Sequence, residues 1–302
     1  MPLIQRSSPY PHWEFSDPAS GDPASSDLLR LVPERGGLVT GWRCSGREML
    51  YLDQQRFGDP SRSVRGGIPV LFPICGGLPG DRLPLPQGEF TLPQHGFARD
   101  LPWQLAELED GRGVAMELKD SAESRKLFPF VFSLTLEVRL AASALEIQMV
   151  VDNCGDQPMP FSLGLHPYFN VSRLETVRFE GLPSTCLDHS TMKPAVTAEQ
   201  VAELARGVDL LVRPTENLPP IPAVGLVDPE AGTRLELQLT PPLDLVVIWT
   251  DPPRAMVCLE PWSGPRQALI SGDRRLELAP GESRRLGCRY GVGPVAAGST
   301  WR

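Results

Sequence analysis

Apolar and polar residues alternate with a period of two through the middle of the chain. In residues 132–140, every second side chain from Phe132 to Leu140 is apolar, and the side chains between them are polar. This alternation predicts a strand with one buried face. Residues 144–153 repeat the pattern. The short Ala-Ala-Ser link between the two segments predicts a hairpin, with a further turn at residues 153–156.

The same alternation continues to the C-terminal part of the chain, at residues 233–239, 243–249 and 274–292. Helical periodicity is scarce. The best helix candidate is residues 197–207, where Thr197 and Gln200 predict a capping box and Gly207 predicts the end. The 33 prolines are about twice the average usage of ~5% and suit the turns and edge strands of a large protein. We predict an all-β fold of antiparallel sheets.

Length and charge limit the class of protein. A chain of 302 residues, 41% of them hydrophobic, can bury one large core or two ordinary ones. The formal charge of −8, with scattered Lys and Arg, argues against binding to nucleic acid or an anionic membrane surface. No apolar run approaches ~20 residues, and the first residues lack the pattern of a secretion signal. We therefore expect a soluble cytoplasmic protein. The sequence does not specify an oligomeric state.

Cysteine and histidine spacing gives no sign of a metal site. The six cysteines lie far apart with no CxxC pair, and the four histidines form no HxxxH or HxH pair. We predict buried free thiols and no metal. The glycine-rich residues 74–81 lack the GxxxxGK[ST] pattern of a nucleotide loop. A flexible loop is predicted at residues 15–27, where DPAS nearly repeats.

Candidate acid/base and ligand-binding groups lie in short motifs that are far apart in the chain. The segment PQHGFAR, residues 93–99, places Gln94, His95 and Arg99 close together, a combination suited to a polar or anionic small molecule. Arg65 precedes two glycines, whose backbone freedom can present a guanidinium to an oxyanion. Taken alone, His95 could be a structural histidine and Arg65 a surface arginine on a turn.

His166 and Glu260 are a candidate acid and base. His166 stands in LGLHPYFN, and Glu260 ends the apolar run MVCLE directly before Pro261 and Trp262. Partial burial there would raise the pKa of Glu260 toward the range of a useful base. The alternatives are a hydrogen-bonded structural histidine and a glutamate exposed on an edge strand. An imidazole together with a carboxylate is what proton transfer at neutral pH requires.

Four segments together resemble a known family. RGGIPVLFP, PQHGFAR, LHPYFNV and CLEPW occur in the order and spacing of the aldose 1-epimerase (mutarotase) superfamily. The resemblance extends over about residues 35–290 and is strongest to the branch of the glucose-6-phosphate 1-epimerases. It implies a galactose mutarotase-like β-supersandwich, and we predict one domain over residues 1–302.

The resemblance also implies an activity and a role for each matching residue. The activity is interconversion of the α and β anomers of an aldohexose or its 6-phosphate by ring opening and closure, with no cofactor. In the implied mechanism, His166 is the general acid, Glu260 is the general base, and His95 hydrogen-bonds the sugar near the reacting centre. Arg65, Gln94 and Arg99 would contact the ligand, the two arginines at a 6-phosphate. Asp209 would bind sugar hydroxyls. Pro167 departs from the family pattern by removing a hydroxyl and a backbone donor.

Two other functions remain open from the residues. The same scaffold could serve as a carbohydrate-binding or regulatory module. A polysaccharide hydrolase or lyase would need a pair of carboxylates about the scissile bond, with Asp81, Asp100 and Asp251 as further acids. Anomer exchange separates the three functions.

Overall fold

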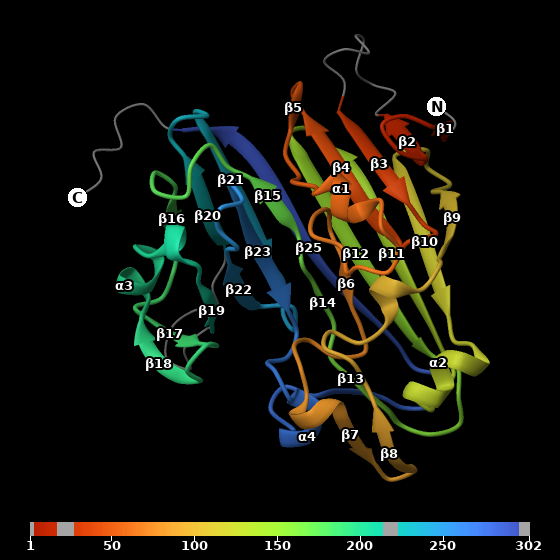
Figure 1. Cartoon of the computed structure of the whole chain (residues 1–302). Coiled ribbons are helices and arrows are strands. Elements are labelled where there is room, and N and C mark those ends of the chain that lie inside the picture. Colours follow the sequence, from red (N-terminus) through yellow and green to blue (C-terminus); the bar gives the residue numbers. More distant parts are fainter. Residues whose placement is uncertain (1–2, 17–26, 214–222, 296–302) are drawn as a thin grey trace.

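The computed structural model describes residues 3–16, 27–213 and 223–295, and its strands form three large sheets (Figure 1). Within these residues, every pairing between named strands is antiparallel, as predicted. The N-terminal sheet has the order β1 (Ile4–Arg6), β2 (His12–Ser16), β3 (Leu28–Val32), β4 (Leu38–Cys44) and β5 (Arg47–Glu48).

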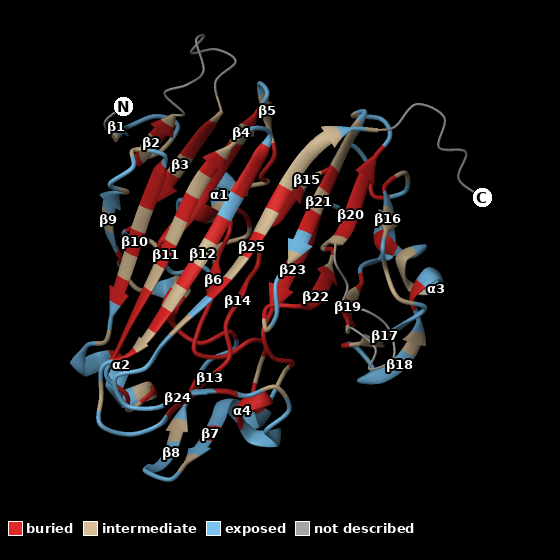
Figure 2. Ribbon diagram, turned by 180° about the vertical axis from the view of Figure 1, so that it is seen from behind, coloured by how far each residue is buried: buried red, intermediate tan, exposed pale blue. Residues whose placement is uncertain are grey.

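The second sheet is a broad layer of eight strands. Figure 2, seen from behind, shows its central strands side by side with buried and less buried residues alternating along them. Its order is β16 (Arg178–Glu180), β20 (Ala223–Asp228), β21 (Thr233–Leu239), β25 (Ser283–Pro294), β12 (Ala144–Asn153), β11 (Phe132–Ala141), β10 (Gly113–Lys119) and β9 (Gln104–Glu107). The predicted hairpin is confirmed, because β11 pairs with β12 from Phe132↔Asn153 to Ala141↔Ala144.

The third sheet carries the candidate site. Its order is β18 (Lys193–Val196), β17 (Thr185–Asp188), β19 (Asp209–Val212), β22 (Leu245–Trp249), β23 (Met256–Trp262), β14 (Gly164–Leu165) and β6 (Val70–Leu71), with β15 (Tyr168–Asn170) also paired to β23. Two small pairs, β7 (Arg82–Leu85) with β8 (Gly88–Thr91) and β13 (Met159–Phe161) with β24 (Leu276–Leu278), complete the strands described.

Helices are short, as the sequence predicted. They are α1 (Gln54–Phe57), α2 (Ala122–Leu127), α3 (Thr197–Val201) and α4 (Ala268–Ser271), with 3-10 turns η1 (Pro79–Asp81), η2 (Ala98–Asp100) and η3 (Leu204–Arg206). The predicted capping box is wrong: Val196 is the N-cap of α3 and makes no side-chain capping bond. The cause is the strand pairing, since the Thr197 N–H donates to the Ser184 carbonyl at 3.0 Å and continues the β17–β18 pairing into the helix. Gly207 does end η3.

Two further expectations need correction. The predicted loop 15–27 begins too early, because Phe15 and Ser16 belong to β2 and Phe15 is buried against the core. Residues 17–26 lie outside the described residues. All six cysteines are free, but only five are buried, because Cys154 is exposed after β12 has ended.

The largest hydrophobic cluster draws on all three large sheets and reaches from Phe15 to Tyr290. Such continuity is what a single domain requires, and the single domain over 1–302 stays a prediction. None of the helices described has the length and apolarity needed to cross a membrane.

Candidate active site

One face of the third sheet supplies the floor of the site. Because side chains alternate across a strand, Cys258, Glu260 and Trp262 of β23 point to the same side. Val247 lies opposite Glu260, and Trp249 lies opposite both Cys258 and Asp209. Two residues of β23 on the opposite face, Val257 and Leu259, belong to the main core. One face of these strands therefore holds the fold together, and the other presents polar groups.

A hollow of about 260 Å³ lies over this face and brings the predicted motifs together. All seven residues singled out from the sequence line it, although they come from five separate segments of the chain. They are Arg65, Gln94, His95, Arg99, His166, Asp209 and Glu260. Ser63, Val247, Trp249, Trp262 and Arg266 complete the lining. The convergence is a structural fact, and the catalytic and binding roles remain predictions.

Glu260 is a buried carboxylate with little compensation. Its residue is 1% exposed, and its Oε2 accepts a 3.0 Å hydrogen bond from Trp262 Nε1. Burial raises the pKa of Glu260 well above its usual value, and the negative charge of Asp209 adds to the rise. The direction is the one expected of a base near an apolar strand end. Glu260 lies inside the sheet, so the alternative of an exposed edge-strand glutamate does not hold.

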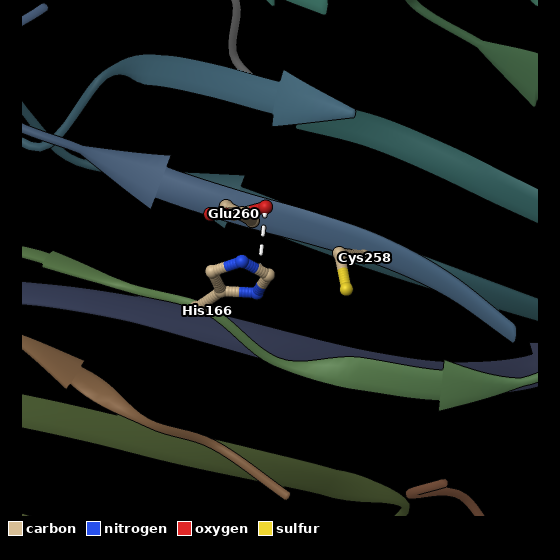
Figure 3. Close-up of side chains that lie close together, drawn as sticks. All are labelled: His166, Cys258 and Glu260. Atoms are coloured by element: carbon tan, nitrogen blue, oxygen red, sulfur yellow. Dashed lines mark ion pairs between the residues drawn. The ribbon is translucent and has the colours of Figure 1, made fainter. Parts of the chain in front are cut away.

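His166 faces Glu260 from the segment between β14 and β15. Its Nδ1 lies 3.5 Å from Glu260 Oε1 (Figure 3), yet it has no aligned hydrogen-bond partner and is fully buried. Tyr168 stacks on the ring at 4.8 Å with an interplanar angle of 11°, and Trp249 packs edge-on at 5.6 Å. Burial, then the charges of Arg99 and Arg65, lower the pKa of His166 to about 3. The imidazole is therefore neutral at pH 7.

Pro167 fits this segment without loss of a backbone hydrogen bond. The His166 N–H donates to the Pro69 carbonyl at 2.9 Å, and the Tyr168 N–H donates to the Gly67 carbonyl at 3.0 Å. Because backbone donors alternate in direction along an extended segment, the nitrogen of Pro167 does not face the segment that contains Pro69 and Gly67. The missing N–H therefore removes no hydrogen bond from this pairing.

His95 is held in one tautomer by the backbone. The Gly76 N–H donates to His95 Nδ1 at 3.1 Å, and the His95 N–H donates to the Gly76 carbonyl at 2.7 Å. Because burial and the neighbouring His166 and Arg99 hold the pKa of His95 well below its usual value, the ring is neutral. Its proton is therefore on Nε2, which makes that atom a hydrogen-bond donor. The Gln94 side-chain amide lies 3.3 Å from Nε2, and its oxygen is the atom that can accept from this donor.

Two of the arginines that line the hollow, Arg65 and Arg99, are the charges that act most strongly on His166. Arg65 precedes Gly66 and Gly67, whose φ values of 138° and 67° confirm the backbone freedom expected there. A Cβ at Gly66 would lie 2.5 Å from the Leu52 Cα, so a side chain cannot be accommodated. Arg99, in η2, donates to the Gln94 carbonyl at 2.9 Å.

Asp209 opens β19 and is held by two donors. Its Oδ1 lies 2.7 Å from His189 Nδ1, and its Oδ2 accepts a 2.6 Å hydrogen bond from Arg266 Nη2. Since a carboxylate only accepts, His189 Nδ1 carries the proton. The His189 ring is buried and lies nearly parallel to the Trp262 indole at 6.1 Å. His189 thus contacts both the Asp209 carboxylate and the indole that donates to Glu260.

Sequence reasoning missed His189, Trp249 and Arg266 as members of this site. Arg266 stands six residues after Glu260, a proximity that could have suggested it. Trp249 ends a strand predicted from its alternation, but the partner strands, and hence its neighbours, were unknown. His189 carries no local signal, because its contacts with Asp209 and Trp262 are all long-range.

Three potential metal ligands lie within 4.8 Å of one another: His166, Cys258 and Glu260 (Figure 3). Burial, then the charge of Glu260, raise the pKa of the Cys258 thiol well above its usual value, so the thiol keeps its proton. A metal ligand must lose that proton, and the arginines of the hollow oppose a further cation. The trio does not favour a metal ion, and the absence of a metal remains a prediction.

Comparisons with known proteins agree with this geometry. The Slr1438 protein from Synechocystis sp. PCC 6803 superimposes with a TM-score of 0.86 at 35% identity, over 98% of this chain and 97% of its own. A galactose mutarotase related enzyme from Lactobacillus acidophilus has a TM-score of 0.73 at 20% identity, over 93% of this chain and 97% of its own, and shows the shared fold alone.

Curated relatives match over a shorter stretch. The "Putative glucose-6-phosphate 1-epimerase" of Escherichia coli (strain K12) is 32% identical over 158 residues, 51% of this chain and 49% of that protein. The chain matches about half the length of such curated relatives. The sequence profile described as Aldose 1-epimerase matches residues 27–291. The fold is thus the galactose mutarotase-like β-sandwich expected from the sequence, and the chain belongs to the aldose 1-epimerase family.

Proposed function

We propose that the protein interconverts the α and β anomers of an aldohexose 6-phosphate. The observation that carries the proposal is the buried pair of His166 Nδ1 and Glu260 Oε1, 3.5 Å apart in a hollow lined by the other predicted site residues. The family and the names of the curated relatives support an epimerase of this type. The substrate and the role of each residue are our own assignment.

The chemistry needs one proton removed and one delivered. Glu260 takes the proton of the anomeric hydroxyl, His166 gives a proton to the ring oxygen, the bond between C1 and the ring oxygen breaks, and C1 becomes a carbonyl. Rotation about the bond between C1 and C2 followed by the reverse transfers closes the ring as the other anomer. Protons and electrons balance without a redox or metal co-reactant.

The pair starts with a single proton to share. Burial opposes a charge on either partner, so it favours the arrangement in which the proton is on Glu260 and His166 is neutral. Transfer between atoms 3.5 Å apart gives the ionised pair that the forward reaction uses. His95, with its proton on Nε2, supplies a fixed donor near the reacting centre.

The charge distribution orients the sugar. The charges that act most strongly on His166 are those of Arg99 and Arg65, whereas those acting on Glu260 are Asp209, Arg266 and Arg99, so Arg65 is the cation specific to the His166 side. The ring oxygen is bonded to C5, which carries C6, so a 6-phosphate falls on the His166 side, beside the two arginines. Guanidinium groups match phosphate oxygens, and Asp209 remains for hydroxyls near C1 and C2.

The hydrolase alternative has no support from its candidate acids. None of Asp81, Asp100 and Asp251 lines the hollow. The second carboxylate there is Asp209, and both of its oxygens are engaged, by His189 and Arg266. Such a carboxylate suits binding better than proton transfer.

Anomer exchange followed by NMR tests the proposal directly. The panel contains glucose, galactose and mannose, each with and without a 6-phosphate, in the presence of a chelator. We expect acceleration of at least one 6-phosphate. Binding without acceleration on the whole panel would favour a carbohydrate-binding module, and release of a sugar from a glycoside would favour a hydrolase.

A further inference from the structure

The two arginines beside His166 are poorly neutralised within the described part of the chain. The nearest carboxylate oxygen to Arg65 is Asp251 Oδ2 at 3.9 Å, and that carboxylate accepts a shorter 2.7 Å bond from Arg254. Arg99 lies 3.9 Å from Asp100, and its Nε is buried with no hydrogen-bond partner. A buried donor without a partner calls for an explanation. An oxyanion between these guanidiniums would supply one.

The same charges act on the imidazole. Arg65 lies 5.6 Å from the Trp249 ring centre, and Trp249 packs edge-on against His166 at the same distance. Tyr168 covers one face of the imidazole and the His95 ring lies 5.6 Å away, so His166 cannot turn freely from the arginines. The positive charges of Arg65 and Arg99 oppose the formation of a positive charge on the His166 ring. The carboxylates that line the hollow, Glu260 and Asp209, have the opposite effect and favour a positive charge on the ring.

We propose that an oxyanion of the phosphate class, bound between Arg65 and Arg99, switches His166 on as the proton donor. The negative charge cancels the two guanidiniums, so the shared proton can pass from Glu260 to His166. The phosphate of the substrate then contributes to turnover as well as to binding. This inference rests on the proposed function and adds a regulatory role for one substituent of the substrate.

The negative charge of the phosphate can be supplied separately from the sugar. If the charge alone matters, a free oxyanion in the arginine site must accelerate the anomerisation of a sugar that carries no phosphate. Each unit by which the pKa of His166 rises increases the protonated fraction of the ring about tenfold while that fraction is small. We therefore expect a rise of about tenfold or more in kcat for glucose at saturating anion.

The experiment measures glucose anomer exchange against sulfate concentration at constant ionic strength set by sodium chloride. Sulfate is the probe because it is too weak a base to catalyse anomerisation itself, and a blank without protein is subtracted at each concentration. Constant ionic strength removes general screening. Arg65→Gln and Arg99→Gln remove one charge each, and Arg82→Gln is the matched control, since Arg82 is exposed and outside the hollow.

The expected result is saturable activation of glucose turnover in the wild type and in Arg82→Gln, with loss of activation in both site variants. Sulfate should also inhibit glucose 6-phosphate turnover competitively. No activation, or equal activation in Arg99→Gln, would overturn the inference while normal glucose 6-phosphate turnover left the proposed function standing. If the wild type exchanges neither sugar under any condition, the proposed function itself fails. Folding of each variant is checked by circular dichroism, and the two independent site variants guard against one that misfolds.

Discussion

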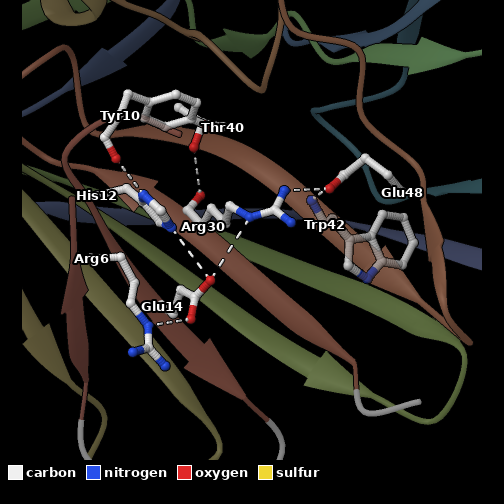
Figure 4. A network of polar contacts seen from close by, with 8 residues as sticks. All are labelled: Arg6, Tyr10, His12, Glu14, Arg30, Thr40, Trp42 and Glu48. Atoms are coloured by element: carbon white, nitrogen blue, oxygen red, sulfur yellow. Dashed lines mark hydrogen bonds and ion pairs between the residues drawn. The ribbon is translucent and has the colours of Figure 1, made fainter. Parts of the chain in front are cut away.

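Among the residues that the structure describes, two histidine–glutamate pairs have nearly equal spacing, and they differ in what surrounds them. In the N-terminal sheet, His12 Nε2 lies 3.4 Å from Glu14 Oε1 (Figure 4). In the hollow, His166 Nδ1 lies 3.5 Å from Glu260 Oε1. Distance alone does not tell a structural pair from a candidate catalytic one.

The N-terminal pair is fully engaged with its neighbours. His12 Nδ1 lies 2.7 Å from the Tyr10 carbonyl, and Glu14 accepts a 3.0 Å hydrogen bond from Arg6 Nε (Figure 4). Arg30 Nε lies 4.0 Å from the same carboxylate. Partial burial alone would raise the pKa of Glu14, but the hydrogen bonds from Arg6 and His12 outweigh it and hold the pKa below its usual value.

The pair in the hollow lacks those partners. His166 Nδ1 has no hydrogen bond, and at Glu260 the Trp262 donor and the charges of Arg266 and Arg99 do not outweigh burial. The pKa of Glu260 moves up where that of Glu14 moves down. Buried polar groups that line a hollow and lack hydrogen-bond partners are the ones to which a ligand can bind. The His12–Glu14 pair already has its hydrogen-bond partners within the protein.

The largest effect is expected from substitutions that break the His166–Glu260 pair and leave the His12–Glu14 pair intact. His166→Ala and Glu260→Gln should each lower kcat for glucose 6-phosphate by ~10²–10⁴-fold, the usual worth of a positioned acid or base. Glu14→Gln is the matched control and should keep wild-type activity. Anomer exchange by NMR provides the rates. A near-normal rate in Glu260→Gln would remove that residue from the mechanism.

The arginines give the next largest effect. Arg65→Ala should reduce the preference in kcat/KM for glucose 6-phosphate over glucose by about 10-fold to 100-fold, since a hydrogen bond to a charged group is worth roughly 1.5–3 kcal/mol. Kinetics with both sugars measure the ratio. If Arg65→Ala leaves the ratio unchanged, Arg65 does not contact the phosphate, and Asp251 is its true partner.

His189 provides a smaller test of the support behind the hollow. His189→Phe keeps an aromatic ring against Trp262 but removes the donor to Asp209, so KM should rise about tenfold with a smaller change in kcat. His189→Asn keeps a donor near the position of Nδ1 and should recover most of the KM. Equal KM values in the two variants would show that the contact with Asp209 does not support substrate binding.

Stability gives the smallest effect, and its sign differs between the two glutamates. The raised pKa of Glu260 means that ionising it costs stability as pH rises above 4.5, so Glu260→Gln should raise the Tm at pH 8 and raise it less near pH 4.5. The lowered pKa of Glu14 gives stability that is present at neutral pH and lost on acidification, so Glu14→Gln should lower the Tm at pH 7. Thermal melts at several pH values check both signs, and equal signs would contradict the comparison.

Much of the fold and part of the site could be predicted, because both are written in local patterns. The two-residue alternation of 132–140 and 144–153 depends only on neighbours in the chain, and the hairpin followed from it. Gln94, His95 and Arg99 stand in one short segment, so their proximity was visible.

What escaped prediction depends on contacts between distant segments. His189 and Arg266, which were not predicted, meet the predicted Asp209 through strand pairings and a loop that no local pattern specifies. The capping box predicted at Thr197 failed for a related reason. The Thr197 N–H donates to the Ser184 carbonyl, directly before β17, and this bond decides where α3 begins. The motif His12-Trp13-Glu14 also shows that an acid and a base close in sequence do not by themselves make a site.

The anomer exchange rate of glucose 6-phosphate with chelator present, compared between wild type, Glu260→Gln and Glu14→Gln, decides which pair moves protons. We expect acceleration by the wild type and by Glu14→Gln, and its loss in Glu260→Gln with binding retained. Acceleration that survives in Glu260→Gln, or that disappears in Glu14→Gln while the fold is intact, would contradict the claim that the unsatisfied pair is the one that moves protons.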